Sequence, residues 1–153
     1  MAVILCIDDE PTILELYATL MEAKGYKVLT APDGPTGIAL SRTHPVDAVV
    51  LDFNMVGMDG NQVAQVLRKE QPSLPVVIWS GCIEHIPESL RWFADAFLYK
   101  GDGPEALFPT IERILKDSAT RQRPLNERKG RVLATGTSET ALRAAGRRRS
   151  GTY

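Results

Sequence analysis

Three continuous aliphatic runs constrain the fold of this chain more than any other feature of its sequence. The runs are Val3-Ile4-Leu5, Val49-Val50-Leu51 and Val76-Val77-Ile78. A strand with one face in water alternates apolar and polar residues, whereas a strand covered on both faces is apolar throughout. Because these runs do not alternate, they predict buried strands of a parallel sheet that lies between two layers of helices.

Segments with helical spacing separate the apolar runs, so the order of elements predicts an α/β fold. Right-handed crossovers between parallel strands place the connecting helices on both faces of the sheet. We expect strands over Ala2–Ile7, Tyr26–Thr30, Asp47–Leu51, Val76–Trp79 and Ala96–Tyr99. We expect helices from Pro11 to Gly25, from Asp33 to before Pro45, from a cap at Asp59 or Asn61 to before Pro72, around Pro87–Phe93 and around Leu107–Leu115.

The charge distribution divides the chain near residue 120. Residues 1–120 carry 9 Lys and Arg against 17 Asp and Glu, a net charge of -8, whereas residues 121–153 carry 9 against 2, a net charge of +7. Residues 117–153 contain no Phe, Trp, Ile or Met, and such a segment buries too little apolar surface to offset its ordering entropy. We therefore expect a folded domain over residues 1–118 and a basic, disordered tail over residues 119–153.

The cellular location is also suggested by composition. No apolar run approaches the length that crosses a bilayer, and the two cysteines, Cys6 and Cys82, form no disulfide framework. These features predict a cytoplasmic protein that does not associate with membranes.

Acidic, hydroxyl and lysine side chains follow four of the five predicted strands. Asp8 and Asp9 follow the first strand, Asp52 the third, Ser80 the fourth and Lys100 the fifth. Ligands of parallel α/β sheets bind at this carboxyl edge. Carboxylates held close together repel one another, and Mg²⁺ relieves the repulsion. A carboxylate beside the metal can accept a phosphoryl group while a lysine and a hydroxyl meet its oxygens.

In their order and spacing these motifs resemble the receiver domain of two-component response regulators. The resemblance covers roughly residues 2–116 and implies a (βα)5 doubly wound, flavodoxin-like fold, with a parallel five-stranded sheet in strand order 2-1-3-4-5. The motifs that carry it are Asp8-Asp9, Val49-Val50-Leu51-Asp52, Met58-Asp59-Gly60, Trp79-Ser80-Gly81 and Tyr99-Lys100.

The resemblance implies a phosphoacceptor and a metal site. Asp52 matches the aspartate that takes a phosphoryl group from a histidine kinase or a histidine phosphotransfer protein. Asp8 and Asp9 match the acidic pair that holds Mg²⁺, together with Asp52 and the backbone carbonyl of Asn54.

The resemblance also implies the residues that bind and sense the phosphoryl group. Lys100 matches the lysine that pairs with it, and Ser80 and Phe97 match a switch formed by a hydroxyl and a rotating aromatic ring. The sequence departs from the family pattern at two positions where a proline is usual: Gly101 follows the lysine, and Val56 lies in the loop after the acceptor.

These matches imply a stand-alone response regulator that acts as a phosphorylation switch and not as an enzyme of small metabolites. It would catalyse its own aspartyl phosphorylation and dephosphorylation. A downstream protein would bind the face formed by the fourth helix and the fifth strand, and weak homodimerisation stays open. No helix-turn-helix pattern is present, so sequence-specific DNA binding is not expected.

Several alternatives stay open from the sequence. Asp8 or Asp9 alone could cap the helix that begins near Pro11, and Phe97 could be an ordinary core residue. The chain could be a degenerate receiver that serves as a phosphorylation-independent scaffold, or its arginine-rich tail could bind nucleic acid. A haloacid-dehalogenase-type phosphatase is disfavoured, since the Asp-x-Asp motif and a cap insertion are missing, and a dinucleotide-binding enzyme is disfavoured by the lack of glycine before Gly25.

Overall fold

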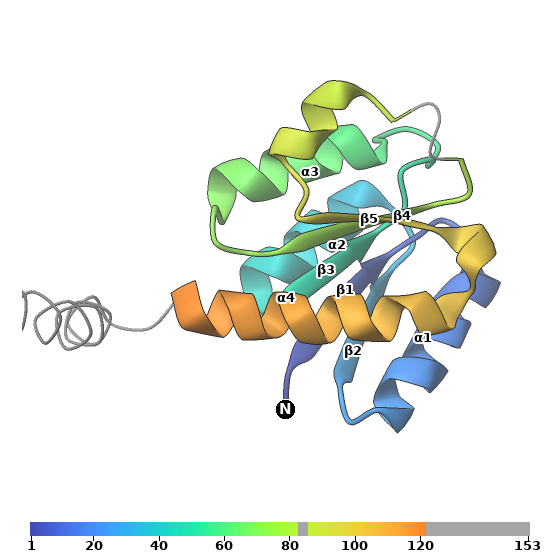
Figure 1. Ribbon diagram of the computed structural model, residues 1–153. Helices are drawn as coiled ribbons and strands as arrows, with labels where there is room; N and C mark the ends of the chain where they lie inside the picture. The colour runs from blue at the N-terminus through green and yellow to red at the C-terminus, as the bar shows by residue number, and fades with distance from the viewer. Residues whose placement is uncertain (83–85, 122–153) are drawn as a thin grey trace, which may run out of the picture. The chain divides into compact units, whose positions relative to one another are not determined.

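The computed structural model describes residues 1–82 and 86–121 and shows a sheet of parallel strands with helices on both faces (Figure 1). The strands are β1 (Val3–Ile7), β2 (Lys27–Ala31), β3 (Ala48–Leu51), β4 (Val76–Ser80) and β5 (Ala96–Tyr99). The α-helices are α1 (Pro11–Ala23), α2 (Gly34–Thr43), α3 (Gly60–Glu70) and α4 (Leu107–Arg121). Three short 3₁₀ helices are η1 (Glu88–Trp92), η2 (Lys100–Asp102) and η3 (Pro104–Ala106).

The strand order is β2-β1-β3-β4-β5, and every neighbouring pair is parallel. The flavodoxin-like order predicted from the sequence is therefore confirmed. Ile7, the last residue of β1, pairs with Ala31 on one side and with Leu51 on the other. This register sets the carboxyl ends of β1 and β3 side by side.

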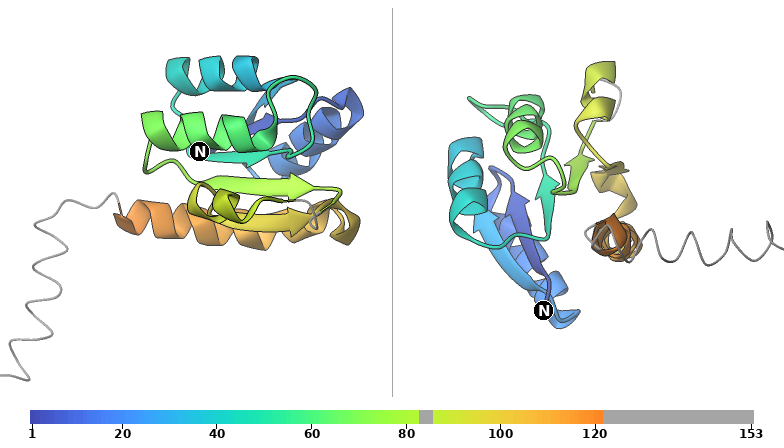
Figure 2. Two further views of the ribbon diagram at one scale, coloured as in Figure 1. Left: turned by 90° about the horizontal axis from the view of Figure 1, so that it is seen from above. Right: turned by 90° about the vertical axis from the view of Figure 1, so that its left-hand side faces the viewer.

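Alternating side chains of the central strands fill two separate core layers. Leu5, Val49 and Ile78 point into the layer covered by α2 and α3, while Ile4, Val50 and their neighbours point into the layer of α1 and α4. Figure 2 shows α2 and α3 on one side of the sheet and α4 on the other. Since all residues of β3 and β4 are buried, the continuous aliphatic runs are explained by two-sided burial.

The start of α3 is fixed by a cap and by a close backbone contact. Asp59 accepts a hydrogen bond from the Gln62 backbone N–H (2.9 Å), and the Gln62 side chain accepts one from the Asp59 N–H (3.1 Å). A Cβ on Gly60 would lie 2.6 Å from the Asp52 carbonyl oxygen and 2.6 Å from the Phe53 Cα. Glycine at position 60 thus lets α3 pack directly against the backbone that follows β3.

The connection between β4 and β5 differs from the sequence prediction. The α-helix expected around Pro87–Phe93 is instead the 3₁₀ helix η1, in the part of this connection that the structure describes. Pro87 is extended (φ -60°, ψ 141°), no side chain caps the helix, and Leu90 is its one buried residue. One inward apolar residue cannot support a longer amphipathic helix, because most helical stability comes from packing an apolar face.

An ion pair ties this short connection to the sheet and to α3. Arg68 of α3 donates to the Phe93 carbonyl (3.1 Å) and to the Asp95 carboxylate (3.0 Å). The same Asp95 oxygen accepts a hydrogen bond from the Val76 N–H at the start of β4 (2.8 Å). These bonds anchor the start of β5. In the described part of this connection they do so without the long helix that the sequence predicted.

Two sequence predictions concern the outer parts of the chain. Residues 1–118 form one compact unit. The predicted disorder of the tail stays a prediction, because residues 122–153 lie outside the described part of the chain. No helix among the described residues is long and apolar enough to span a membrane.

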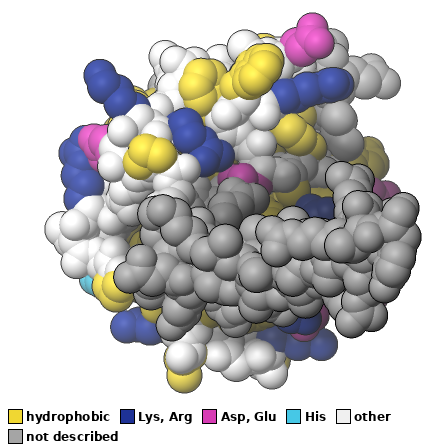
Figure 3. Space-filling model, turned by 60° about the vertical axis from the view of Figure 1, so that its left-hand side comes forward, with side chains coloured by type: hydrophobic (Ala, Val, Ile, Leu, Met, Phe, Trp, Pro, Cys, Tyr) yellow, Lys and Arg dark blue, Asp and Glu magenta, His cyan; other side chains and the backbone are white. Residues whose placement is uncertain are grey.

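On the face shown in Figure 3, lysine and arginine side chains of the described residues lie scattered, with hydrophobic side chains between them.

The contact at Gly60 leads to a prediction about stability. Gly60→Ala should lower the free energy of unfolding by about 1–3 kcal/mol, since the new methyl group meets backbone atoms that cannot rotate away. Urea denaturation measures the change. Gly81→Ala is the matched control, because a Cβ there meets nothing within 4 Å, and it should change stability by less than about 0.5 kcal/mol. Equal stability of the two variants would contradict the packing argument.

Candidate functional site

A lysine lies between two buried carboxylates at the carboxyl edge of the sheet. The Lys100 Nζ is 2.9 Å from Asp8 Oδ2 and 3.4 Å from Asp52 Oδ1. Asp8 and Asp52 each come one residue after the last paired residues of β1 and β3, so the register places them together. Asp8 is fully buried and Asp52 is 4% exposed. Three residues predicted from the sequence thus form one cluster.

This cluster is short of positive charge. Burial and the negative charge of Asp8 raise the pKa of Asp52 from 3.8 to about 6, although Lys100 lowers it in part. Burial lowers the pKa of Lys100, but its bonds to Asp8 and the charge of Asp52 raise it more, so it lies above its ordinary value. Lys100 therefore stays an ammonium, and one ammonium does not fully balance two buried carboxylates.

Two further carboxylates extend the cluster toward solvent. Oxygen atoms of Asp8, Asp9 and Glu10 all lie within 4.8 Å of one another, and Asp9 and Glu10 are exposed. The Asp9 Oδ2 accepts a hydrogen bond from the Val56 N–H (3.4 Å), which joins the loops after β1 and β3. Glu10 is a residue to which sequence analysis assigned no role, although it directly follows the acidic pair.

The donor set fits a hard divalent cation. Mg²⁺ binds through one or two carboxylates and keeps other positions for water or phosphate oxygens. The exposed carboxylates of Asp9 and Glu10 offer oxygen ligands. Burial and the negative charge of Asp8 raise the pKa of Asp52, so added positive charge is favourable beside it. The alternative role of Asp8 or Asp9 as a helix cap is not observed: Glu10 is the N-cap residue of α1, and no side chain caps the helix. The Asp8 Oδ1 accepts from the Glu10 N–H (3.0 Å), which precedes the helix, while its Oδ2 accepts from Lys100.

Ser80 and Asn54 form a second group beside this cluster. The Ser80 hydroxyl, which is fully buried, donates to the Cys82 carbonyl (3.1 Å) and accepts from the Cys82 N–H (3.2 Å). The Asn54 side-chain amide donates to the same oxygen at 3.4 Å. These partners hold the hydroxyl toward the loop after β4. A hollow of about 410 Å³ lies next to Asn54 and is lined by Asp9, Phe53, Asn54, Met55, Val56 and Asp59.

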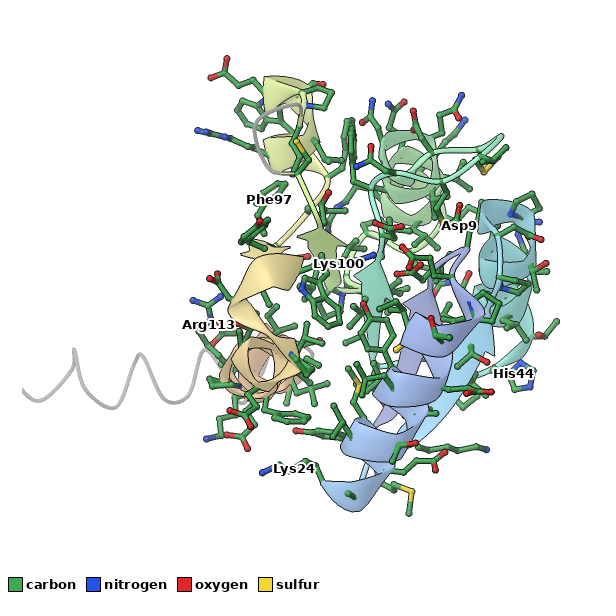
Figure 4. The ribbon with its side chains drawn as sticks, turned by 90° about the vertical axis from the view of Figure 1, so that its right-hand side faces the viewer. Asp9, Lys24, His44, Phe97, Lys100 and Arg113 are labelled. Carbon is green, nitrogen blue, oxygen red and sulfur yellow. The ribbon has the colours of Figure 1, made fainter. Side chains whose placement is uncertain are left out.

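Phe97 is not part of the charged cluster. It pairs with Ile78 in the sheet and packs, partly buried, against the core layer of α2 and α3. In the view of Figure 4, Lys100 lies near the middle of the molecule and Phe97 toward its edge. This position agrees with a core role and does not by itself assign a switch role.

An aromatic pair lies on the other face of the sheet, and sequence analysis did not connect it to the site. The rings of Tyr17 and Trp79 lie with their centroids 4.6 Å apart. Burial, and then the negative charge of Asp8, raise the pKa of Tyr17, which shows that its hydroxyl lies close enough to feel the carboxylate. Trp79 is 3% exposed and belongs to the core layer of α1 and α4. Nothing in the helical spacing of Tyr17 pointed to this proximity.

The comparison with family models agrees with the geometry. The model of the response regulator receiver domain matches residues 4–112. The chain therefore belongs to the response regulator receiver family, as the motifs at the strand ends suggested.

Relatives of known sequence differ in how much of their length the chain matches. The protein PilH of Pseudomonas aeruginosa is 34% identical over 119 residues, which cover 75% of this chain and 98% of PilH. The transcriptional regulatory protein GlrR of Escherichia coli is 33% identical over 118 residues, which cover 76% of this chain but 27% of GlrR. The chain thus matches about a quarter of the length of this longer regulator.

Solved structures show the same fold. The response regulator TrrA of Thermotoga maritima, in complex with Mg²⁺–BeF, superposes with a TM-score of 0.71 at 27% identity, covering 74% of this chain and 99% of TrrA. TrrA in complex with the histidine kinase ThkA gives a TM-score of 0.69 at 28% identity, covering 75% of this chain and 99% of TrrA.

The raised pKa of Asp52 leads to a prediction about pH. A carboxyl whose pKa is higher in the folded protein costs stability once it ionises, so the cost appears as pH rises from 4 to above 6. Asp52→Asn should therefore be more stable than the unmodified protein at pH 8, by on the order of 1–2 kcal/mol after allowance for solvent screening. The gain should shrink toward pH 4. Urea denaturation in EDTA measures it, and a gain independent of pH would contradict the assignment.

Proposed function

We propose that this chain is a phosphorylation switch that accepts a phosphoryl group on Asp52 from a histidine kinase or a histidine phosphotransfer protein. The observation that carries the proposal is the buried Asp52 carboxylate, held by Lys100 and flanked by the acidic residues that fit Mg²⁺. Membership of the receiver family supports it, and so does the complex of the similar receiver TrrA with a histidine kinase.

The chemistry needs an ionised Asp52. With a pKa of about 6, this carboxylate is mostly charged at pH 7 and can attack phosphorus. A P–O bond to Asp52 forms while the P–N bond of the phosphohistidine breaks, and the leaving imidazole keeps the electron pair and takes a proton. Transfer of this kind depends mostly on positioning and on neutralising the charge of the phosphoryl oxygens.

We place Mg²⁺ at the acidic edge. Asp8, Asp9, Asp52 and the backbone carbonyl of Asn54 would hold it, and Glu10 is close enough to contribute through water. When bound, the metal would neutralise charge on the phosphoryl oxygens. That the similar receiver TrrA forms a complex with Mg²⁺–BeF supports this placement.

Three other residues would respond to the phosphoryl group. Lys100, now 3.4 Å from Asp52 Oδ1, would exchange part of this contact for a phosphoryl oxygen. Ser80 would leave the Cys82 backbone and donate its hydroxyl to another phosphoryl oxygen. Phe97 would repack as the end of β4 moves. The phosphoryl group needs to favour the active arrangement by only about 3–5 kcal/mol to change the dominant state.

The surface that responds would include η1 and β5, and a downstream protein would sense it. Slow hydrolysis of the aspartyl phosphate, catalysed by the same site, would reset the switch. We further propose that residues 1–118 are the receiver domain and residues 119–153 a separate basic segment, and that the protein acts in the cytoplasm, where the free thiols of Cys6 and Cys82 would persist.

The decisive experiment is phosphorylation by a small donor. With Mg²⁺ and acetyl phosphate, intact mass should show one phosphoryl adduct that is lost on mild alkaline or hydroxylamine treatment. Asp52→Asn should give none, and neither should an EDTA sample, since the acceptor or the metal is missing. Asp59→Asn is the matched control on the same edge of the sheet, where asparagine can still cap α3, and it should be phosphorylated normally.

Two outcomes would overturn this function. Absence of an adduct from the unmodified protein under conditions that phosphorylate a known receiver would favour the scaffold alternative. An adduct that persists in Asp52→Asn would move the acceptor to another residue.

A further inference from the structure

The ring of Tyr99 packs directly onto the backbone of Gly101. A Cβ built on Gly101 would lie 2.1 Å from Tyr99 Cε1, 2.6 Å from Cζ and 2.9 Å from Cδ1. The ring therefore occupies the space that the side chain of any other residue at position 101 would need. Lys100, which reaches both buried carboxylates, is the residue between the two.

The backbone around Lys100 is held firmly on one side only. Before it, Tyr99 pairs with Ser80 in the last rung of the ladder between β4 and β5. After it, the turn η2 is closed by a backbone hydrogen bond from the Gly103 N–H to the Lys100 carbonyl (3.1 Å). Gly101 and Asp102 are exposed. The turn is only three residues long and buries none of them, so a side chain packed on it adds to what holds its shape.

The Tyr99 ring is suited to supply this contact. Tyr99 is 41% exposed, so burial in a core layer does not hold the ring in position. One edge of the ring meets Gly101, while a large part of the residue stays exposed. A planar side chain in this arrangement covers the turn and restricts how its backbone can move.

We propose that Tyr99 is a positioning residue that holds the turn after Lys100 and so keeps the Lys100 ammonium between Asp8 and Asp52. Glycine at position 101 is the partner that makes room for the ring. The proposal rests on the proposed function in one respect: the positioned ammonium serves phosphoryl transfer to Asp52. Loss of the ring frees the turn and slows the transfer, without changing the carboxylates that bind Mg²⁺.

The first test compares variants of the full chain in acetyl phosphate phosphorylation followed by intact mass. Tyr99→Ala should slow adduct formation roughly tenfold, because a small misplacement of a charge-stabilising group has a large kinetic effect. Tyr99→Phe keeps the ring and should restore the rate. Tyr26→Ala is the matched control: it removes a half-buried tyrosine ring just before β2, at the amino end of the strands and away from the acidic edge, and should leave the rate unchanged.

Mg²⁺ affinity separates positioning from general damage. Calorimetric titration should give a Mg²⁺ affinity for Tyr99→Ala at least as high as for the unmodified protein, since no ligand of the metal is altered and a less confined ammonium competes less with the metal. A clearly weaker affinity would show general damage to the site and would overturn the proposal. A Tyr99→Ala rate equal to that of the unmodified protein would overturn the proposal. A Tyr99→Phe rate as slow as that of Tyr99→Ala would do the same, because the hydroxyl and not the ring would then matter.

A double-mutant cycle tests the contact itself. Gly101→Ala should displace the ring and slow phosphorylation about as much as Tyr99→Ala does. The double variant should be no slower than either single variant, since both remove the same contact. Multiplicative effects of the two substitutions would show that they act independently and would overturn the pairing.

Amide hydrogen exchange decides the proposal even if no phosphorylation is observed. The Gly103 N–H, which closes the turn, should exchange at least about fivefold faster in Tyr99→Ala, while the Val50 N–H in the centre of the sheet should be unaffected. Unchanged exchange at Gly103 would overturn the proposal. An absent adduct in the unmodified protein, by contrast, would count against the proposed function and not against the role of Tyr99.

Discussion

The contact of one ammonium with two buried carboxylates is the interaction on which the site depends. Asp8 and Asp52 are almost excluded from water. In such a buried place the repulsion of like charges is much stronger than at the surface. Lys100 offsets part of this repulsion, but burial and the charge of Asp8 still raise the pKa of Asp52 to about 6. The carboxyl edge is therefore a place where further positive charge is favourable. A metal ion bound at this edge would satisfy that need.

The strand order makes this contact attainable. β1 and β3 are neighbours, so the backbone register alone brings Asp8 next to Asp52. β5 lies at the edge of the sheet, with β3 and β4 between it and β1. Only a long side chain can therefore reach from the end of β5 to Asp8 and Asp52. Lysine meets that requirement if the turn that begins with it has a defined shape. This is why the contact between Tyr99 and Gly101 bears on the chemistry of residues far from it in sequence.

The region around η1 shows how the same fold can vary without loss of the site. The described part of the β4–β5 connection is anchored by Leu90 in the core and by the bonds of Arg68 and Asp95, not by a full helix. Trp92 remains 81% exposed on it. Since Ser80 and Lys100 are fixed by strand ends, the carboxyl edge does not need a long helix there. The surface that a partner would meet nevertheless differs from the one that the predicted α-helix would have formed.

The amino-acid pattern was enough to predict the layered sheet, its strands and the residues at their ends. Continuous aliphatic runs such as Val49-Val50-Leu51 require burial on both faces, and the end of a strand places Asp52 or Lys100 at a common edge whatever the details of packing. The contacts between side chains became clear from the three-dimensional structure alone: Lys100 meets Asp8 as well as Asp52, and the backbone of Cys82 binds the Ser80 hydroxyl. The structure also showed that the 3₁₀ helix η1 stands where an α-helix was predicted. Those outcomes depend on side-chain direction and on contacts between distant segments, which local spacing does not encode.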